Sequence, residues 1–506
     1  MPVVLFGTDG VRGTISERTV SNPMYEYIEN RIFSKELCGE IGYWASFVSG
    51  KGEVVIGWDR RPTNQKIAEY LAISLGGRCS EVSLLGETTT PALQYEMTLR
   101  QAALGIMITA SHNPSTDTGM KLLFRNGRKP TKGEEAGIES NMFQVERGER
   151  LIPDITPSSC ANYIESVSEK IQSLVQEGAF PKYDLMIDGS GGWISSWLAD
   201  LMSSQGVKCR ELASRTGPIN LNCGAGGLSE GRISWKECKE SQHILLKEIQ
   251  PVPKGQIIGF CFDGDGDRCY MICSLGDSAN IVGGDGFLSL FLQSRNKKEG
   301  FVVSVTVESS LDLSKRILAV PNGKIIETGV GDRWLQHALM REDEGILRLG
   351  AEPSGHVVLE HSIQDDTGLW GDGILTMFEF LRMIRFCGPE WVDLFYSERG
   401  IIMSGSIFPS NRSLWNPAGE TGDLARKAIS SRFNIDGTQI HELKIEGEDD
   451  LLMMRFDDGE DWSVAVRNSG TEEKTRLTIR TTSNDRDKVK LALDDIIHVL
   501  RPVLSP

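Results

Sequence analysis

Short apolar runs that end in small polar residues or glycines recur along most of the chain. Leu104 to Ile108, Tyr183 to Asp188, Ile257 to Phe262 and Phe301 to Thr306 each have the length and composition of a buried β-strand. Amphipathic stretches with helical spacing lie between such runs, as from Lys35 to Val48. This alternation predicts α/β domains whose chemistry lies at the carboxyl ends of the strands.

The carboxyl-terminal part of the chain follows a different pattern. His441 to Glu446, Leu451 to Phe456, Trp462 to Val466 and Thr475 to Thr481 are typical of strands, and turn residues join them as hairpins. A helix from about Asp485 to Leu500 repeats its apolar residues at helical spacing. The pattern predicts a smaller α+β module with an antiparallel sheet.

The length and composition of the chain indicate how many domains it has and what kind of partner it binds. A chain of 506 residues is too long for one core and suggests three or four domains. The net charge of −16 argues against nucleic acid and anionic membranes as partners, so we expect a small-molecule partner. No apolar run is long enough to span a bilayer and the first residues lack a signal-peptide pattern, which predicts a cytoplasmic protein.

The ten cysteines show no paired C-x-x-C spacing. We therefore expect reduced, mostly structural cysteines, and the spacing does not predict a zinc site. Cys261, Cys269 and Cys273 flank an acidic loop and are interpreted as small core residues of its two strands.

Ser111 follows the apolar run that ends at Ile108, in the sequence TASHNP. A serine at the end of a buried strand, with His112 beside it and Lys121 farther on, is a candidate nucleophile with a hydrogen-bonding neighbour and a base. The alternative is an ordinary polar loop after a strand.

Asp263, Asp265 and Asp267 alternate with glycines in the sequence FDGDGDR. In an extended loop the three carboxylates can turn to one side and bind a hard cation, which would offset their mutual repulsion. The EF-hand pattern does not fit, because Arg268 stands where that loop requires glycine. The alternative is an acidic, solvated turn.

Two glycine-containing loops are candidate anion sites. The segment FGTDGVRGT places Arg12 among glycines, which allow an anion to approach the backbone closely. RNSGTE places Arg467, Ser469, Gly470 and Thr471 between two predicted strands, where they can bind an anion. A plain hairpin loop is the alternative for the second segment.

A third loop, GAEPSGH, carries side chains suited to sugar hydroxyls. Glu352, Ser354 and His356 occupy alternating positions, so a carboxylate, a hydroxyl and an imidazole can converge on one ligand. A structural histidine beside a strand is the alternative interpretation of His356.

In their order along the chain, FGTDGVRG, TASHNP, DGDGDR, AEPSGH and RNSGTE resemble the α-D-phosphohexomutase superfamily. The resemblance implies three related α/β domains with mixed sheets, followed by a smaller α+β domain, around a central cleft. The implied domains are 1–155 with a phosphoserine loop, 156–275 with a metal loop, 276–392 with a sugar loop and 393–506 with a phosphate loop.

The resemblance also implies roles for the candidate residues. It implies that Ser111 carries a phosphoryl group and, with Asp263, Asp265 and Asp267, binds one Mg²⁺ ion. The residues implied around the transferring phosphoryl group are Arg12, His112, Lys121 and Arg268, with Lys121 as proton shuttle. The residues implied to bind the sugar phosphate are Glu352, Ser354, His356, Arg467, Ser469, Gly470 and Thr471.

The implied reaction interconverts hexose 6-phosphate and hexose 1-phosphate through a bisphosphorylated sugar, which also activates the enzyme. Thr118, Pro353 and Asn468 depart from common residues of the family, but none removes a required chemical group. The motifs narrowly favour glucosamine phosphate over glucose or mannose phosphate, the phosphoglucomutase/phosphomannomutase alternative. A non-catalytic sugar-phosphate sensor and a phosphatase are further alternatives, and the oligomeric state stays open.

Overall fold

The computed structural model describes residues 5–7, 9–76, 81–144, 153–295, 299–395, 400–433, 440–468 and 473–505. They belong to two compact units, each made of two chain segments. The first unit contains Met1–Ser294 and Pro353–Val392, and the second contains Arg295–Glu352 and Asp393–Pro506. The finer division into four domains stays a prediction.

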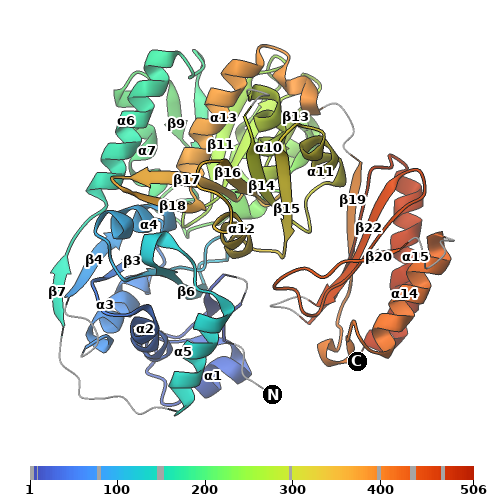
Figure 1. Ribbon diagram of the computed structural model, residues 1–506. Helices are drawn as coiled ribbons and strands as arrows, with labels where there is room; N and C mark the ends of the chain where they lie inside the picture. The colour runs from blue at the N-terminus through green and yellow to red at the C-terminus, as the bar shows by residue number, and fades with distance from the viewer. Residues whose placement is uncertain are drawn as a thin grey trace. The chain divides into compact units, whose positions relative to one another are not determined.

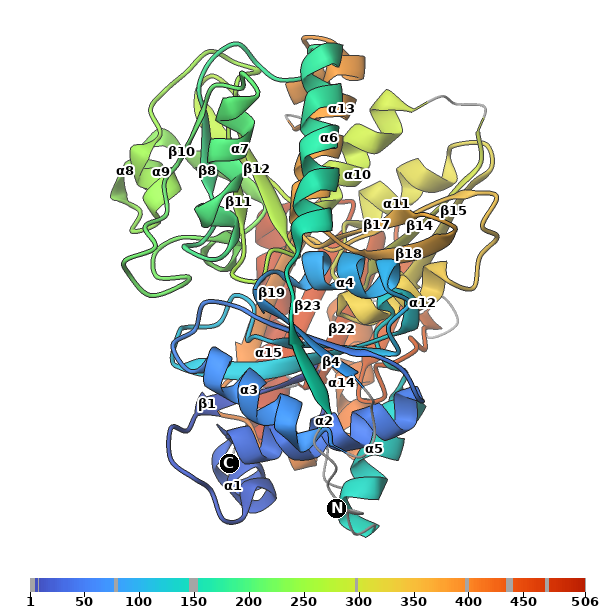
Figure 2. The ribbon, with the colours of Figure 1, turned by 90° about the vertical axis from the view of Figure 1, so that its left-hand side faces the viewer.

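The first unit begins with a mixed seven-stranded sheet in the order β2-β1-β6-β5-β3-β4-β7. Helices cover both of its faces, with α4 on the face opposite α2, α3 and α5 (Figure 1 and Figure 2). The strands are β1 (Val11–Ile15), β2 (Ile32–Phe33), β3 (Val54–Trp58), β4 (Glu81–Glu87), β5 (Leu104–Ile108), β6 (Asp117–Phe124) and β7 (Asp154–Pro157). The helices are α1 (Pro23–Asn30), α2 (Lys35–Ser49), α3 (Asn64–Ser74), α4 (Thr90–Leu99) and α5 (Lys132–Gln144).

Helix α2 shows how the sequence builds this layer. The Ser34 side chain accepts a hydrogen bond of 3.2 Å from the Leu37 N–H and so caps the helix start. Leu37, Ile41 and Trp44 recur at helical spacing and are buried in the core beneath the sheet. Burial of this apolar face fixes the helix on the sheet that carries the Ser111 loop.

A second sheet of the first unit has the order β10-β13-β12-β11-β8-β9. Its strands are β8 (Leu185–Asp188), β9 (Cys209–Glu211), β10 (Gly231–Ser234), β11 (Ile257–Phe262), β12 (Cys269–Ser274) and β13 (Ser278–Val282). The accompanying helices are α6 (Ala161–Glu177), α7 (Leu198–Ser204), α8 (Trp235–Glu240), α9 (Ile244–Glu248), α10 (Gly284–Ser294) and α13 (Gly373–Cys387). Figure 2 shows α6 alongside α13, and Arg385 binds Glu177 across this contact at 3.5 Å.

In the second unit, β14 (Phe301–Thr306) lies between two parallel strands, β15 (Gly323–Thr328) and β16 (Leu347–Ala351). The helices α11 (Leu311–Leu318) and α12 (Asp332–Leu339) belong to this layer. An antiparallel sheet follows in the order β19-β23-β22-β21-β20, with α14 and α15 together on one face (Figure 1). Its elements are β19 (Ile401–Ile407), α14 (Glu420–Phe433), β20 (His441–Glu442), β21 (Leu452–Asp457), β22 (Asp461–Asn468), β23 (Thr475–Thr481) and α15 (Arg486–Leu504).

The predicted fold class is confirmed: mixed-sheet α/β layers precede an antiparallel α+β layer. The predicted final helix is present as α15, with Val489, Leu493 and Ile496 buried against the sheet. Among the described residues, no helix has the length and apolar character needed to cross a membrane.

A hairpin of the first unit, β17 (Val357–Ile363) and β18 (Asp366–Gly371), contains a buried histidine. His361 stacks on Trp370 with ring centroids 4.1 Å apart, and burial lowers its pKa to about 3. The folded state therefore keeps this imidazole neutral, whereas the unfolded chain binds a proton at pH values below about 6.5. The free energy of unfolding should thus fall as the pH drops from about 6.5 toward 3.

We expect His361→Phe, which keeps an aromatic ring against Trp370, to remove this part of the acid sensitivity. Between about pH 7 and about pH 5 the variant should lose about 2 kcal/mol less stability than the wild type. Urea unfolding at both pH values measures the difference. An equal loss in both proteins would contradict the neutral, buried state of His361.

Candidate functional site

Ser111 lies directly after β5, at the carboxyl end of a central strand of the first sheet. Its φ of 53° is in the left-handed region, and its N–H donates to the Thr109 Oγ1 at 2.8 Å. The Ser111 hydroxyl donates to Asp263 Oδ2 at 2.7 Å and lies 3.5 Å from His112 Nδ1. The candidate nucleophile therefore contacts the aspartate loop through Asp263, which lies 152 positions later in the sequence.

Arg61 holds the serine loop, residues 109–114, by its backbone. Its guanidinium donates to the carbonyl oxygens of Ser111 at 2.9 Å, Asn113 at 2.8 Å and Asp117 at 2.9 Å, and also to that of Pro114. The buried Asp59 carboxylate accepts a bond of 3.1 Å from the Arg61 Nε and so orients the guanidinium. The sequence interpretation missed Arg61, although its place after β3, at the same sheet edge as Ser111, was a usable signal.

A segment that the sequence left unassigned packs on the same loop. Asn220 donates through Nδ2 to the carbonyl oxygens of Ser111 at 2.8 Å and Asn113 at 3.1 Å. At Gly226, a Cβ atom would lie only 2.6 Å from the His112 Cβ, so this close approach requires glycine. The glycine-rich segment 220–227 thus supports the serine loop from the second sheet.

The aspartate loop joins β11 to β12 as the turn of an antiparallel hairpin. Asp263, Asp265 and Asp267 are buried, and one carboxylate oxygen of each lies within 4.8 Å of the others. Burial, together with the charges of the other two carboxylates, raises the pKa of Asp263 well above its usual range. The buried Asp265 Oδ1 has no hydrogen-bond partner among the described residues. These all-oxygen donors fit a hard cation such as Mg²⁺.

Lys121 lies among these carboxylates. Its Nζ is 2.7 Å from Asp265 Oδ2, 2.5 Å from Asp267 Oδ2 and 2.9 Å from Asp9 Oδ2. Burial alone would lower the pKa of Lys121, but the three carboxylates raise it well above its ordinary value. Asp9 also binds Lys129 at 2.5 Å, so two lysines share this carboxylate. The sequence interpretation gave no role to Lys129.

The other predicted phosphoryl-site residues surround the same point. Arg12 reaches the serine loop through Nη1, which lies 3.4 Å from the Ala110 carbonyl oxygen. The Nε of Arg268 lies 3.8 Å from Asp263 Oδ2. The positive charge of Arg268, reinforced by burial, lowers the pKa of His112 to about 3, so this imidazole stays neutral.

The three residues of the predicted sugar loop divide between the two units. His356 and Ser354 belong to the first, where His356 Nδ1 lies 3.7 Å from Asp267 Oδ1. The buried Ser354 Oγ has no hydrogen-bond partner among the described residues. Glu352 is buried at the end of the second unit's first segment. A sugar-binding role for all three stays a prediction.

Arg467 is the next-to-last residue of β22 in the second unit and is bound by two carboxylates. Its Nη2 lies 3.1 Å from Glu308 Oε1 and its Nη1 lies 3.5 Å from Glu448 Oε1. Arg476 binds the same Glu308 oxygen at 3.1 Å. The remaining predicted phosphate-loop residues lie outside the described residues: Ser469, Gly470 and Thr471.

Comparisons with known proteins identify a family and several similar proteins. The family description "Phosphoglucomutase/phosphomannomutase, alpha/beta/alpha domain I" matches residues 3–149, and that of domain III matches residues 283–394. The phosphoglucosamine mutase of Lactiplantibacillus plantarum is 29% identical, with 98% of each chain covered. That of Ligilactobacillus salivarius is 30% identical over 77% of this chain and 80% of the relative.

Solved structures share the fold at lower identity. A phosphoglucomutase/phosphomannomutase family protein from Burkholderia thailandensis has a TM-score of 0.69 at 19% identity, with 99% of this chain and 97% of that chain covered. The Aspergillus fumigatus N-acetylphosphoglucosamine mutase, in complex with GlcNAc-6P and magnesium, has a TM-score of 0.59 at 14% identity, with 99% and 96% covered. The sequence matches and the buried serine-aspartate centre lead to one conclusion: this chain belongs to the α-D-phosphohexomutase superfamily.

Proposed function

We propose that this protein interconverts glucosamine 6-phosphate and glucosamine 1-phosphate through a phosphoserine at Ser111. The observation that carries the proposal is the contact of 2.7 Å between the Ser111 hydroxyl and the Asp263 carboxylate, with Lys121 and two more aspartates beside it. Phosphoryl transfer requires a positioned nucleophile and charge neutralisation, and these contacts support both requirements. The phosphoglucosamine mutase relatives favour glucosamine as the sugar.

One Mg²⁺ ion fits the aspartate loop, with Asp263, Asp265 and Asp267 as ligands and a phosphoserine oxygen as a further one. The unpartnered Asp265 Oδ1 and the mutual repulsion of the carboxylates both support a cation there. When bound, the ion would neutralise charge on the transferring phosphoryl group.

In the proposed reaction, one phosphoryl group passes from Ser111 to the sugar, and another passes from the sugar back to Ser111. A sugar hydroxyl oxygen attacks the phosphorus, and the bond from phosphorus to Ser111 Oγ breaks. Lys121, which the neighbouring carboxylates keep protonated, is the proposed proton shuttle: its ammonium group gives a proton to the departing Ser111 Oγ and then takes up the proton of the sugar hydroxyl. The bisphosphorylated sugar then reverses its orientation, and Ser111 accepts its other phosphoryl group. The same bisphosphate would phosphorylate a free Ser111 and so act as activator.

The surrounding cations hold the phosphoryl oxygens. Arg12 and Arg268 supply positive charge, while the neutral His112 can accept or donate one hydrogen bond without adding charge. We further propose that Glu352, Ser354 and His356 bind the sugar hydroxyls. The phosphate that does not react would bind Arg467, Ser469, Gly470 and Thr471.

Other substrates and classes remain as alternatives. A phosphoglucomutase/phosphomannomutase would prefer glucose or mannose phosphates, and a coupled assay with all three sugars separates these activities. A phosphatase would release inorganic phosphate faster than isomerised sugar. A non-catalytic sensor would bind the sugar phosphate without turnover, which the intact Ser111, Lys121 and aspartates disfavour. A cytoplasmic location stays a prediction.

Ser111→Ala is the test of the nucleophile. We expect it to abolish isomerisation of glucosamine phosphates, because no oxygen remains to carry the phosphoryl group. Intact-mass measurement after incubation with glucosamine 1,6-bisphosphate should show a phosphoryl adduct on the wild type and none on the variant. Ser173→Ala, on the exposed side of α6, is the control and should behave as the wild type. Wild-type activity in Ser111→Ala would refute the proposal.

Asp265→Asn tests the cation site. The change removes one ligand charge, and we expect turnover to fall by at least about tenfold, with a higher Mg²⁺ concentration needed for half-maximal activity. A chelator should abolish wild-type activity, and added Mg²⁺ should restore it. Asp495→Asn, at an exposed position of α15, should leave the Mg²⁺ dependence unchanged. Activity that resists the chelator would contradict the metal assignment.

Arg467→Ala tests the phosphate loop. Loss of a charge-assisted contact of about 1.5 to 3 kcal/mol should raise the Michaelis constant about tenfold or more, with a smaller fall in turnover. Lysine at this position should restore part of the affinity, because it supplies charge without the planar fork. Arg476→Ala is a matched control, since it also binds Glu308 but lies outside the proposed loop. Equal effects of the two alanine variants would contradict a specific role for Arg467.

A further inference from the structure

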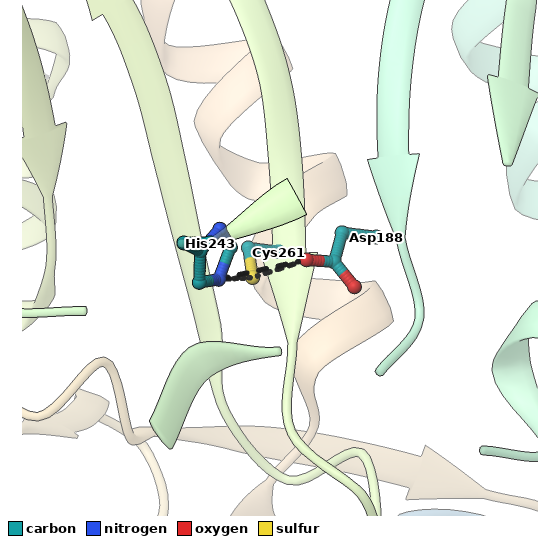
Figure 3. A group of neighbouring side chains, drawn as sticks. All are labelled: Asp188, His243 and Cys261. Atoms are coloured by element: carbon teal, nitrogen blue, oxygen red, sulfur yellow. Dashed lines mark hydrogen bonds and ion pairs between the residues drawn. The ribbon is translucent and has the colours of Figure 1, made fainter. Parts of the chain in front are cut away.

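A second group of potential ligands lies inside the first unit, outside the aspartate loop (Figure 3). Asp188 ends β8, His243 directly precedes α9 and Cys261 lies on β11, and all three side chains are buried. His243 Nε2 is 3.6 Å from Asp188 Oδ2 and 3.9 Å from Cys261 Sγ. Cys261 Sγ is 3.4 Å from the same Asp188 oxygen. Three different donor atoms thus face a common point.

These separations match those of ligands around one small cation. Zinc binds oxygen, nitrogen and sulfur at about 2.0 to 2.3 Å, so its tetrahedral ligand atoms lie roughly 3.3 to 3.8 Å apart. The measured edges of 3.4, 3.6 and 3.9 Å therefore require only a small adjustment to hold an ion. The carbonyl oxygen of Gly224, 3.1 Å from His243 Nε2, is a nearby donor for a fourth position.

The charge at this point is a second, independent observation. Asp188 is fully buried, and its only ion-pair partner in the described part of the chain is His243. Burial raises the pKa of Asp188 because the charged carboxylate is removed from water, and a metal ion at this point would offset that cost. The N–H groups of Ser190 and Gly224 each donate to Asp188 at 2.9 Å and fix the carboxylate's orientation, as supporting groups do in metal sites.

We propose that Asp188, His243 and Cys261 form a structural site for one Zn²⁺ ion. Sulfur and imidazole nitrogen favour zinc over Mg²⁺, which selects oxygen ligands. Binding would release the Cys261 thiol proton to solvent, and His243 would present its Nε2 lone pair to the ion with its ring hydrogen on Nδ1. The inference does not depend on the proposed mutase activity.

The location indicates what the ion would stabilise. Cys261 precedes Asp263 by two positions, and Gly224 leads into the segment that packs on His112 through Gly226. The ion would therefore tie β8, β11 and the segment 220–227 together behind the serine loop. A structural zinc ion at such a junction adds its binding free energy to the stability of the fold.

The same atoms could instead form only hydrogen bonds, from the Cys261 thiol to Asp188 and from the His243 Nε2 to the Gly224 carbonyl. Cys261→Ser keeps a donor toward Asp188, and His243→Gln keeps a donor near the position of Nε2, yet both are poor zinc ligands. These two variants therefore separate a metal site from a hydrogen-bond network.

The experiment measures metal in the full-length protein purified from zinc-supplemented cultures. We expect about one zinc per chain in the wild type and at least about tenfold less in Cys261→Ser and His243→Gln, with lower thermal stability in both. Cys273→Ser, at a buried cysteine of β12 outside this group, should retain the zinc. Wild-type protein without zinc, or unchanged zinc in both variants, would overturn the proposal.

A second measurement does not require the variants to fold. Wild-type protein that has been stripped of metal and titrated with Co²⁺ should develop thiolate-to-cobalt charge-transfer absorption in the near ultraviolet, and Zn²⁺ should displace it. Saturating Mg²⁺ should leave this absorption unchanged, since the two ions would occupy different sites. Absence of the thiolate band in folded wild-type protein would refute coordination by Cys261.

Discussion

The fold of the first unit requires that the negative charge of three buried carboxylates be offset, because their oxygen atoms lie within 4.8 Å of one another. Asp263, Asp265 and Asp267 repel one another, and burial removes the water that would otherwise screen them. Lys121 offsets part of this charge and is itself shared with Asp9. The remaining negative charge favours a divalent cation at this point.

Backbone contacts determine where Ser111 lies relative to these carboxylates. Arg61 and Asn220 approach the serine loop from two different sheets, and both donate to the carbonyl oxygens of Ser111 and Asn113. Neither side chain contacts the Ser111 hydroxyl in the contacts described, so their effect on chemistry is through position. Phosphoryl transfer is sensitive to such positioning, because the nucleophile must be aligned with the bond that breaks.

In the second unit, carboxylates and a carbonyl oxygen hold two arginine side chains in position. Arg467 lies between Glu308 and Glu448, and the buried Arg480 binds Glu327 at 2.8 Å and the Ser309 carbonyl oxygen at 2.8 Å. Under the proposed function, a phosphate that binds Arg467 would compete with Glu308, and its affinity would depend on the strength of this internal pair as well as on the arginine.

The sequence by itself indicated the alternation of strands and helices and the change to an antiparallel module, because apolar periodicity and turn residues are local properties. It also indicated Ser111 and the aspartate loop as candidate site residues, since a strand ending in a polar loop and three alternating aspartates are visible without a structure. It did not reveal that Arg61 and Asn220 hold the serine loop by its carbonyl oxygens. It also did not reveal the group of Asp188, His243 and Cys261, and the cysteine spacing even argued against a zinc site. Only the tertiary structure decided these, because sheet register and loop packing bring together side chains that no sequence interval relates.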